Sequence, residues 1–183
     1  MIRIEKIIII GATARHSGKT ELASAIIKTF SKKEKITGIK ISTVIDGDTS
    51  FHGNIENLNS KFIITKNTSA NTNKSTDRML TAGAFEAFLV HSKAEYLDEA
   101  LIQLVSMIDK NSFIVCESNS LRKSVIPDVF IMIKNTTQPL KDSTTSVIKY
   151  ADLIIDSNGK EFSNFDLSSI TIENGQWAIN NNK

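Results

Sequence analysis

The stretch that decides the fold is IIIIGATARHSGKT, residues 7–20. Its four isoleucines are β-branched with no polar alternation, a pattern typical of a strand buried on both faces of a parallel sheet. A helix is expected to follow from Thr20 to about Lys33, and one apolar stripe along it is formed by Leu22, Ala23, Ile26, Ile27 and Phe30. A second short strand is expected at Gly38–Ile41. The N-terminal part of the chain therefore predicts a strand–helix–strand unit.

The loop between this strand and this helix carries groups suited to binding phosphate. A P-loop needs consecutive backbone N–H groups around a phosphate, an ammonium for the outer phosphates and a hydroxyl for Mg²⁺. Gly18, Lys19 and Thr20 supply these groups, and the positive end of the helix dipole adds to them. An ordinary strand-to-helix turn that binds nothing is the simpler alternative, in which Arg15 and His16 merely face solvent. The candidate phosphate-binding residues are Thr13, Ala14, Arg15, His16, Ser17, Gly18, Lys19 and Thr20.

The loop departs from the usual pattern G-x-x-x-x-G-K-[ST] at its first position. The pattern expects glycine where this chain has Thr13, and Gly11 lies two positions too early to take its place. Thr13 must therefore adopt a backbone conformation that a β-branched residue allows. The departure predicts some loss of affinity, and it keeps open a non-catalytic adaptor that binds nucleotide without turnover.

A second signal is the apolar strand Phe113–Cys116, which ends at the acid Glu117. Ligands of open α/β sheets lie beyond the carboxyl ends of the strands, so Glu117 is expected at the same edge as the loop. A carboxylate there can hold Mg²⁺ or its water shell. Asp46 follows the second strand, where it suits either a metal ligand or a solvated turn. The expected catalytic residues are Lys19 and Glu117, and the expected metal ligands are Thr20, Glu117 and Asp46.

The remaining patterns complete an α/β fold with a mostly parallel sheet in one domain, residues 1–183. Residues 42–73 are expected to form a long loop, mobile or in contact with substrate, interrupted by an edge strand or hairpin arm at 62–64. A terminal hairpin is expected to turn at Asn174-Gly175 between strands 170–172 and 177–179. Further strands are expected at 85–90, 113–116, 129–133 and 153–155, and further helices at 75–84, 96–109 and 143–150.

Composition limits the partners and the compartment. The chain has 183 residues, enough for one hydrophobic core, and its net charge of +2 gives no sign of a nucleic-acid or membrane partner. Its one cysteine, Cys116, excludes an internal disulfide and is expected to be a buried structural thiol on the strand face opposite Glu117. His52 and His91 lack the spacing of zinc ligands. With neither a signal peptide nor an apolar run of about 20 residues, a cytoplasmic protein is expected.

With these residues in view, the chain resembles the family of molybdopterin-guanine dinucleotide biosynthesis protein B (MobB), a group of P-loop accessory proteins. The likeness spans most of the chain and follows the order of the family's motifs. It rests on Gly18-Lys19-Thr20, Gly38-Ile39-Lys40, the segment KSTDRMLTAGA at 74–84, Cys116-Glu117-Ser118 and ADLII at 151–155.

The resemblance implies a P-loop nucleoside triphosphate hydrolase fold and a nucleotide-binding protein, generally linked to GTP. Such proteins assist the conversion of molybdenum cofactor to its guanine dinucleotide form, so the implied partners are a molybdopterin-type cofactor or a maturation protein. Members of the family commonly form homodimers. By this resemblance Lys19 and Thr20 would bind phosphate and Mg²⁺, Glu117 would act at the metal, and Arg78 would contact nucleotide or partner.

Three departures from the family keep the substrate open. Thr13 replaces a glycine, Ser42-Thr43 replace histidines, and Ser118 replaces the glycine after the acid. Maturation of another molybdenum hydroxylase is one alternative. An ATP-dependent small-molecule kinase or ligase, with Arg122 and Lys123 as a phosphate clamp, is another. The guanine-reading pattern N-K-x-D is not seen, so the residues themselves do not decide between GTP and ATP, and the expectation of GTP comes from the resemblance.

Overall fold

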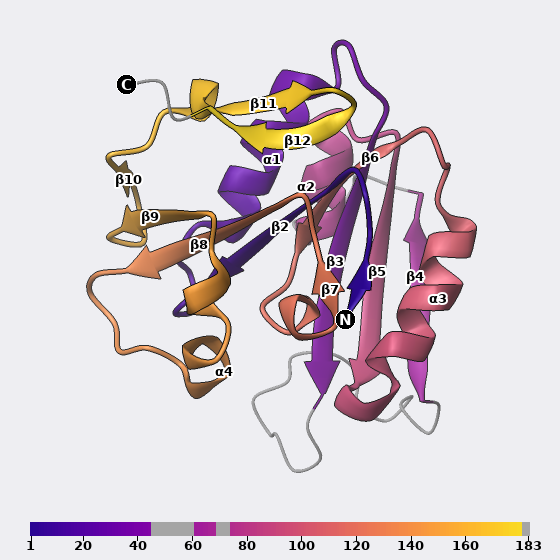
Figure 1. The fold of residues 1–183 in the computed structure, drawn as a ribbon, viewed down its shortest axis with the longest axis horizontal. Coiled ribbons are helices and arrows are strands. Elements are labelled where there is room, and N and C mark those ends of the chain that lie inside the picture. Colours follow the sequence, from indigo (N-terminus) through magenta and orange to yellow (C-terminus); the bar gives the residue numbers. More distant parts are fainter. Residues whose placement is uncertain (45–60, 69–73, 181–183) are drawn as a thin grey trace.

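The protein is a mixed α/β fold around one mostly parallel sheet (Figure 1). The computed structural model describes residues 1–44, 61–68 and 74–180. The strand order in the eight-stranded sheet is β10-β9-β8-β2-β6-β3-β5-β4, and only the edge strands β4 and β10 pair antiparallel with their neighbours. The strands are β2 (Ile7–Ala12), β3 (Ile36–Val44), β4 (Phe62–Asn67), β5 (Glu86–Lys93), β6 (Phe113–Glu117), β8 (Val129–Asn135), β9 (Leu153–Ser157) and β10 (Phe162–Ser163).

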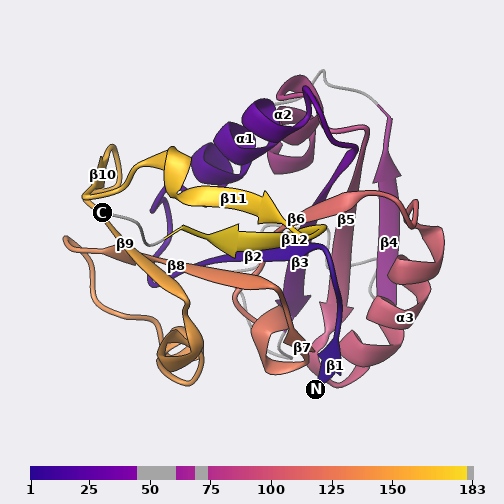
Figure 2. The same ribbon diagram turned by 45° about the horizontal axis from the view of Figure 1, so that its top comes forward.

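Two apolar cores lie on opposite faces of the sheet, because successive side chains of a strand point to opposite sides. On β2, Ile8 and Ile10 join the core beneath α1 (Lys19–Phe30) and α2 (Ser75–Thr81). The neighbouring Ile7 and Ile9 join the core beneath α3 (Leu97–Met107). Figure 2 shows α1 and α2 together on one side of the sheet, with α3 beside β4 and β5. The expectation of a strand buried on both faces is confirmed for β2.

Close packing of α2 on the sheet depends on Gly38 of β3. A Cβ atom added at Gly38 would lie 2.9 Å from the Cβ and Sδ of Met79, which is fully buried. Glycine therefore lets α2 approach β3 more closely than any larger residue would. This contact sets the distance between α2 and the sheet, and with it the position of Ser75 at the start of the helix.

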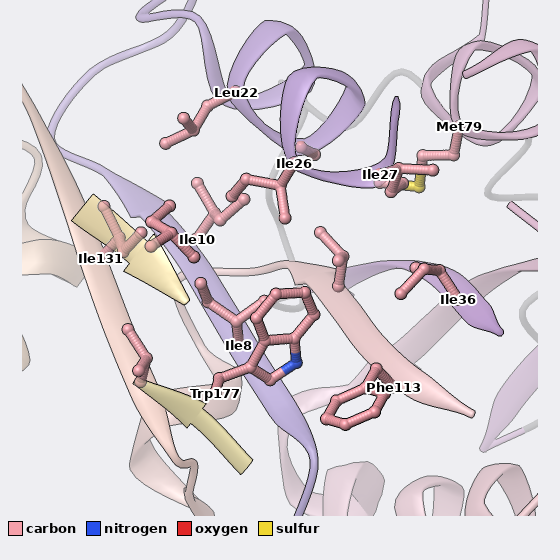
Figure 3. Close-up of a cluster of buried hydrophobic side chains, with 14 of the residues drawn as sticks. Ile8, Ile10, Leu22, Ile26, Ile27, Ile36, Met79, Phe113, Ile131 and Trp177 are labelled. Atoms are coloured by element: carbon pink, nitrogen blue, oxygen red, sulfur yellow. The ribbon is translucent and has the colours of Figure 1, made fainter. Parts of the chain in front are cut away.

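The C-terminal hairpin is confirmed as expected. It pairs β11 (Ile170–Glu173) with β12 (Gln176–Ile179), and its two turn residues, Asn174 and Gly175, have φ values of 51° and 76°. Positive φ at both positions is the requirement of a type I′ turn, which suits asparagine followed by glycine. The hairpin packs on the α1 side of the sheet, where Trp177 is buried beside Ile8 and Phe113 (Figure 3).

Other expectations are corrected in extent. The helix expected over 143–150 is instead two short pieces, α4 (Asp142–Thr145) and a 3₁₀ turn (Ile148–Tyr150). Consecutive Ser, Thr and Val residues there favour helix poorly. The first helix ends at Phe30 rather than Lys33. The pairs β1 (Ile2–Arg3) with β7 (Val125–Ile126), and β10 with β9, were not expected.

The segment expected as a long loop, 42–73, is partly regular. Its first residues extend β3 to Val44, and the expected edge strand is confirmed as β4. Residues 45–60 and 69–73 lie outside the described residues, and Asp46 is among them. None of the described helices combines the length and apolar character needed to cross a bilayer.

Candidate functional site

The loop between β2 and α1, residues 13–18, is held against β8 through Thr13. The backbone N–H of Thr13 donates to the Ile133 carbonyl at 2.9 Å, and its hydroxyl accepts from the Asn135 N–H at 2.9 Å. Its carbonyl accepts from the Lys141 N–H at 3.0 Å. Thr13 is fully buried and has no positive φ, as a β-branched residue requires. The side chain that breaks the glycine pattern therefore anchors the loop.

The far end of the loop needs glycine. Gly18 has φ +94°, and a Cβ atom there would lie 2.9 Å from the Phe162 ring, so any other residue would be both strained and crowded. Two residues earlier, His16 also has positive φ, and it is exposed together with Arg15. The buried Ser17 hydroxyl donates to the Ala14 carbonyl at 3.0 Å, which closes the curve between them.

Asn119 ties the loop to the strand that carries the acid. Its side-chain oxygen accepts from the Ala12 N–H at 2.8 Å, and its amide nitrogen donates to the Ala12 carbonyl at 2.9 Å. Asn119 lies two residues beyond Glu117, so the end of β2 and the end of β6 are joined directly. The loop and the acid thus share the carboxyl edge of the sheet, as expected.

Four side chains at this edge form a connected group, the carboxylate cluster: Thr20, Lys40, Ser75 and Glu117. Glu117 Oε2 accepts from the Thr20 hydroxyl at 3.2 Å and from Lys40 Nζ at 3.4 Å. The Ser75 hydroxyl lies 3.2 Å from Thr20 Oγ1 and accepts from Lys40 Nζ at 2.9 Å. Lys40 and Glu117 are register partners on β3 and β6, which brings them to the same face. The predicted pair Thr20 and Glu117 is therefore brought together.

The second oxygen of Glu117 is an unsatisfied acceptor. The carboxylate is buried, with the side chain 1% exposed, and among the described residues Oε1 has no hydrogen-bond partner. A buried acceptor without a partner costs free energy, which a bound cation or a donor would remove. One carboxylate and two hydroxyls are the hard oxygen donors that suit Mg²⁺, which is usually bound through one or two carboxylates plus substrate phosphates. The donor set therefore fits Mg²⁺ brought in with a phosphate.

The described residues offer no cluster of three or more His, Cys, Asp or Glu side chains that could hold a metal ion. A cation at the carboxylate cluster would therefore need further oxygen ligands from its substrate. This distinguishes the cluster from a structural metal site, whose ligands all come from the protein.

The Lys19 ammonium is buried close to Glu117 and two other lysines. Burial lowers its pKa to about 8, Glu117 opposes that effect, and Lys40 and Lys141 add to it. Lys19 is still mostly protonated at pH 7, but its charged form is costly in the ligand-free protein. A bound phosphate would stabilise that charge.

Two other predicted positions lie apart from the cluster. Arg78 lies on α2, where its guanidinium donates to the Glu21 carboxylate of α1 at 3.0 Å in an exposed ion pair. Cys116 is fully buried on the face opposite Glu117, and burial raises the pKa of its thiol, as suits a structural thiol.

Lys40, Ser75, Asn119 and Asn135 were not expected as site residues. A signal for Lys40 exists in the alternation of β3, because Lys40 shares its face with Ile36 and Gly38 on an inner strand. A lysine at such a position needs a partner, and Glu117 provides it. The other three carry no comparable pattern.

Comparisons of the chain with protein-family models, curated proteins and solved structures found no match.

Proposed function

We propose that the protein is a P-loop protein that binds a nucleoside triphosphate together with Mg²⁺. The observation that carries the proposal is the contact between the Thr20 hydroxyl and the buried Glu117 carboxylate, directly beside Lys19. A hydroxyl and an acid at the metal, with an ammonium for the phosphates, are the recurring parts of such sites.

The backbone around the site supports this proposal. A buried parallel strand leads through a curved loop into α1, whose N-terminal N–H groups have no partners within the helix and suit an anion. Thr13 takes the place of the usual glycine, but its three hydrogen bonds to the chain hold the start of the loop in place. When bound, Mg²⁺ would supply charge neutralisation at the phosphates, with Thr20 and Glu117 holding it or its water shell.

We further propose that the nucleotide is GTP and that the protein is a slow hydrolase or an accessory factor in molybdenum cofactor maturation. These finer assignments rest on the resemblance to the MobB family. A kinase or ligase would use Arg122 as a clamp, yet its guanidinium lies 4.6 Å from the Tyr150 ring centroid and donates to the Val125 carbonyl. The packing of Arg122 favours the accessory role.

The test is the dependence of nucleotide affinity on Mg²⁺ in wild type, Thr20→Val and Glu117→Gln. Wild type is expected to bind GTP or ATP at least tenfold more tightly with Mg²⁺ than with EDTA, because Thr20 and Glu117 would hold a cation that neutralises the charge of the phosphates. Both variants should lose most of that gain and keep the affinity seen in EDTA. Isothermal titration measures both conditions.

Thr29→Val is the matched control, because Thr29 lies on α1 at an exposed position and its hydroxyl donates only to the Ala25 carbonyl. The control should retain the full Mg²⁺ dependence. Equal wild-type affinity in Mg²⁺ and EDTA would contradict the proposed metal role.

A further inference from the structure

We propose that Lys40 is the residue by which this site distinguishes a nucleoside triphosphate from a diphosphate. The inference rests on the proposed function and deepens it, since it names the terminal phosphate as the group that Lys40 recognises. It assigns a role to an ammonium that no part of a usual P-loop accounts for.

The pairing of the two strands β3 and β6 fixes the position of Lys40. Lys40 stands opposite Glu117 in the parallel register of β3 and β6, and its ammonium contacts both Glu117 Oε2 and Ser75 Oγ. Its side chain is 33% exposed, while that of Glu117 is 1% exposed. The Lys40 side chain therefore reaches solvent, while the carboxylate that it contacts does not.

In the ligand-free site, Lys40 supplies the positive charge that Glu117 needs. A divalent cation held by Thr20 and Glu117 would take over that task and would repel the ammonium at close range. The flexible stem of lysine lets the ammonium turn to another anion without movement of β3. Glu117 Oε2 accepts from Lys40 and from Thr20, the residue next to Lys19, so the two ammonium groups flank the same carboxylate cluster.

The terminal phosphate is the anion that suits this ammonium. Lys19 follows the loop and the helix N-terminus, which hold the phosphates of either nucleotide. Lys40 approaches from β3, which is separated from β2 and its loop by β6, the strand that carries Glu117. A triphosphate offers a further charged group for Lys40 to bind, and a diphosphate does not. The preference for triphosphate should therefore depend on Lys40.

The experiment is isothermal titration of GTP, GDP, ATP and ADP, each with Mg²⁺, into wild type, Lys40→Met, Lys40→Gln and Lys40→Arg. Lys40→Met and Lys40→Gln should each lower triphosphate affinity at least tenfold and change diphosphate affinity less than twofold. Lys40→Arg keeps the charge and should keep most of the preference. Circular dichroism checks that each variant is folded.

Lys28→Met is the matched control, because it removes the same charge from an exposed position nine residues beyond Lys19 on α1. It should leave the affinity ratio unchanged. An unchanged ratio of triphosphate to diphosphate affinity in Lys40→Met, whether or not both affinities fall, would overturn the role of Lys40. It would leave the proposed function standing. Failure of wild type to bind any of the four nucleotides would overturn both.

Discussion

Lys19→Met is expected to make the ligand-free protein more stable at pH 7, by about 3 kcal/mol as an upper value. The reason is the cost of holding a charged ammonium where burial, only partly offset by Glu117, lowers its pKa to about 8 from the ordinary 10.5. Methionine has a similar length and no charge, so the cost disappears while the packing is largely kept. Sites built for ligands commonly sacrifice stability in this way. Urea unfolding, followed by the fluorescence of Trp177, measures the difference.

The same lysine gives the wild type a defined pH dependence. Between about pH 8 and 10.5 the ammonium is lost from the folded chain but kept by the unfolded chain, so the unfolded state binds more protons. The free energy of unfolding therefore receives a contribution that rises with pH across this window. Lys19→Met should lack that contribution, and the stability gap between variant and wild type should shrink as pH approaches 10.5.

Lys28→Met again serves as the control, and its stability should lie within about 0.5 kcal/mol of wild type, as for most exposed substitutions. A Lys19→Met protein that is less stable than wild type at pH 7 would contradict this account of the Lys19 environment. So would a gap that does not change between pH 7 and pH 10.

Trp177→Ala is expected to destabilise the protein by about 3–5 kcal/mol, the usual cost of removing a buried large aromatic side chain. Trp177 is 3% exposed, and its ring packs edge-on against Phe30 at 5.0 Å and against Phe113 at 5.5 Å between ring centroids. Its indole N–H donates to the Lys6 carbonyl at 3.1 Å. Figure 3 shows the ring beside Ile8 and Phe113. The substitution removes the main anchor of the hairpin.

Circular dichroism in urea is the measurement here, because the variant lacks the chain's only tryptophan. Glu173→Ala, at an exposed position of the same hairpin, is the control and should change stability by less than about 0.5 kcal/mol. If Trp177→Ala cost no more than this control, the hairpin would not be part of the core.

Much of the fold could be predicted because its signals are local. Four consecutive isoleucines specify a buried strand, the spacing from Leu22 to Phe30 specifies a helix, and Asn174-Gly175 specifies a hairpin turn. Two-residue strands such as β1, β7 and β10 are too short for any periodicity to show. Their pairing depends on tertiary contacts that local patterns do not record.

Part of the candidate site could also be predicted from the sequence, and part could not. Thr20 and Glu117 could be paired in advance, because the carboxyl ends of parallel strands meet at one edge of the sheet. The position of Lys40 opposite Glu117 depends on the register between β3 and β6, and that of Ser75 depends on how α2 packs over Gly38. A single sequence records neither the strand register nor how closely α2 packs on the sheet. The alternation of β3 marks Lys40 as needing a partner, but its pairing with Glu117 and the contact with Ser75 could be recognised only in the structure.

The loop at residues 13–18, together with Lys19, is proposed to bind the phosphates of a nucleotide. The most direct test is isothermal titration of GTP and of ATP, each with Mg²⁺, into wild type and Lys19→Met. Wild type is expected to bind both nucleotides, GTP more tightly, and the folded variant is expected to lose at least a hundredfold in affinity. Absence of binding to wild type, or equal affinity in wild type and Lys19→Met, would contradict this proposal.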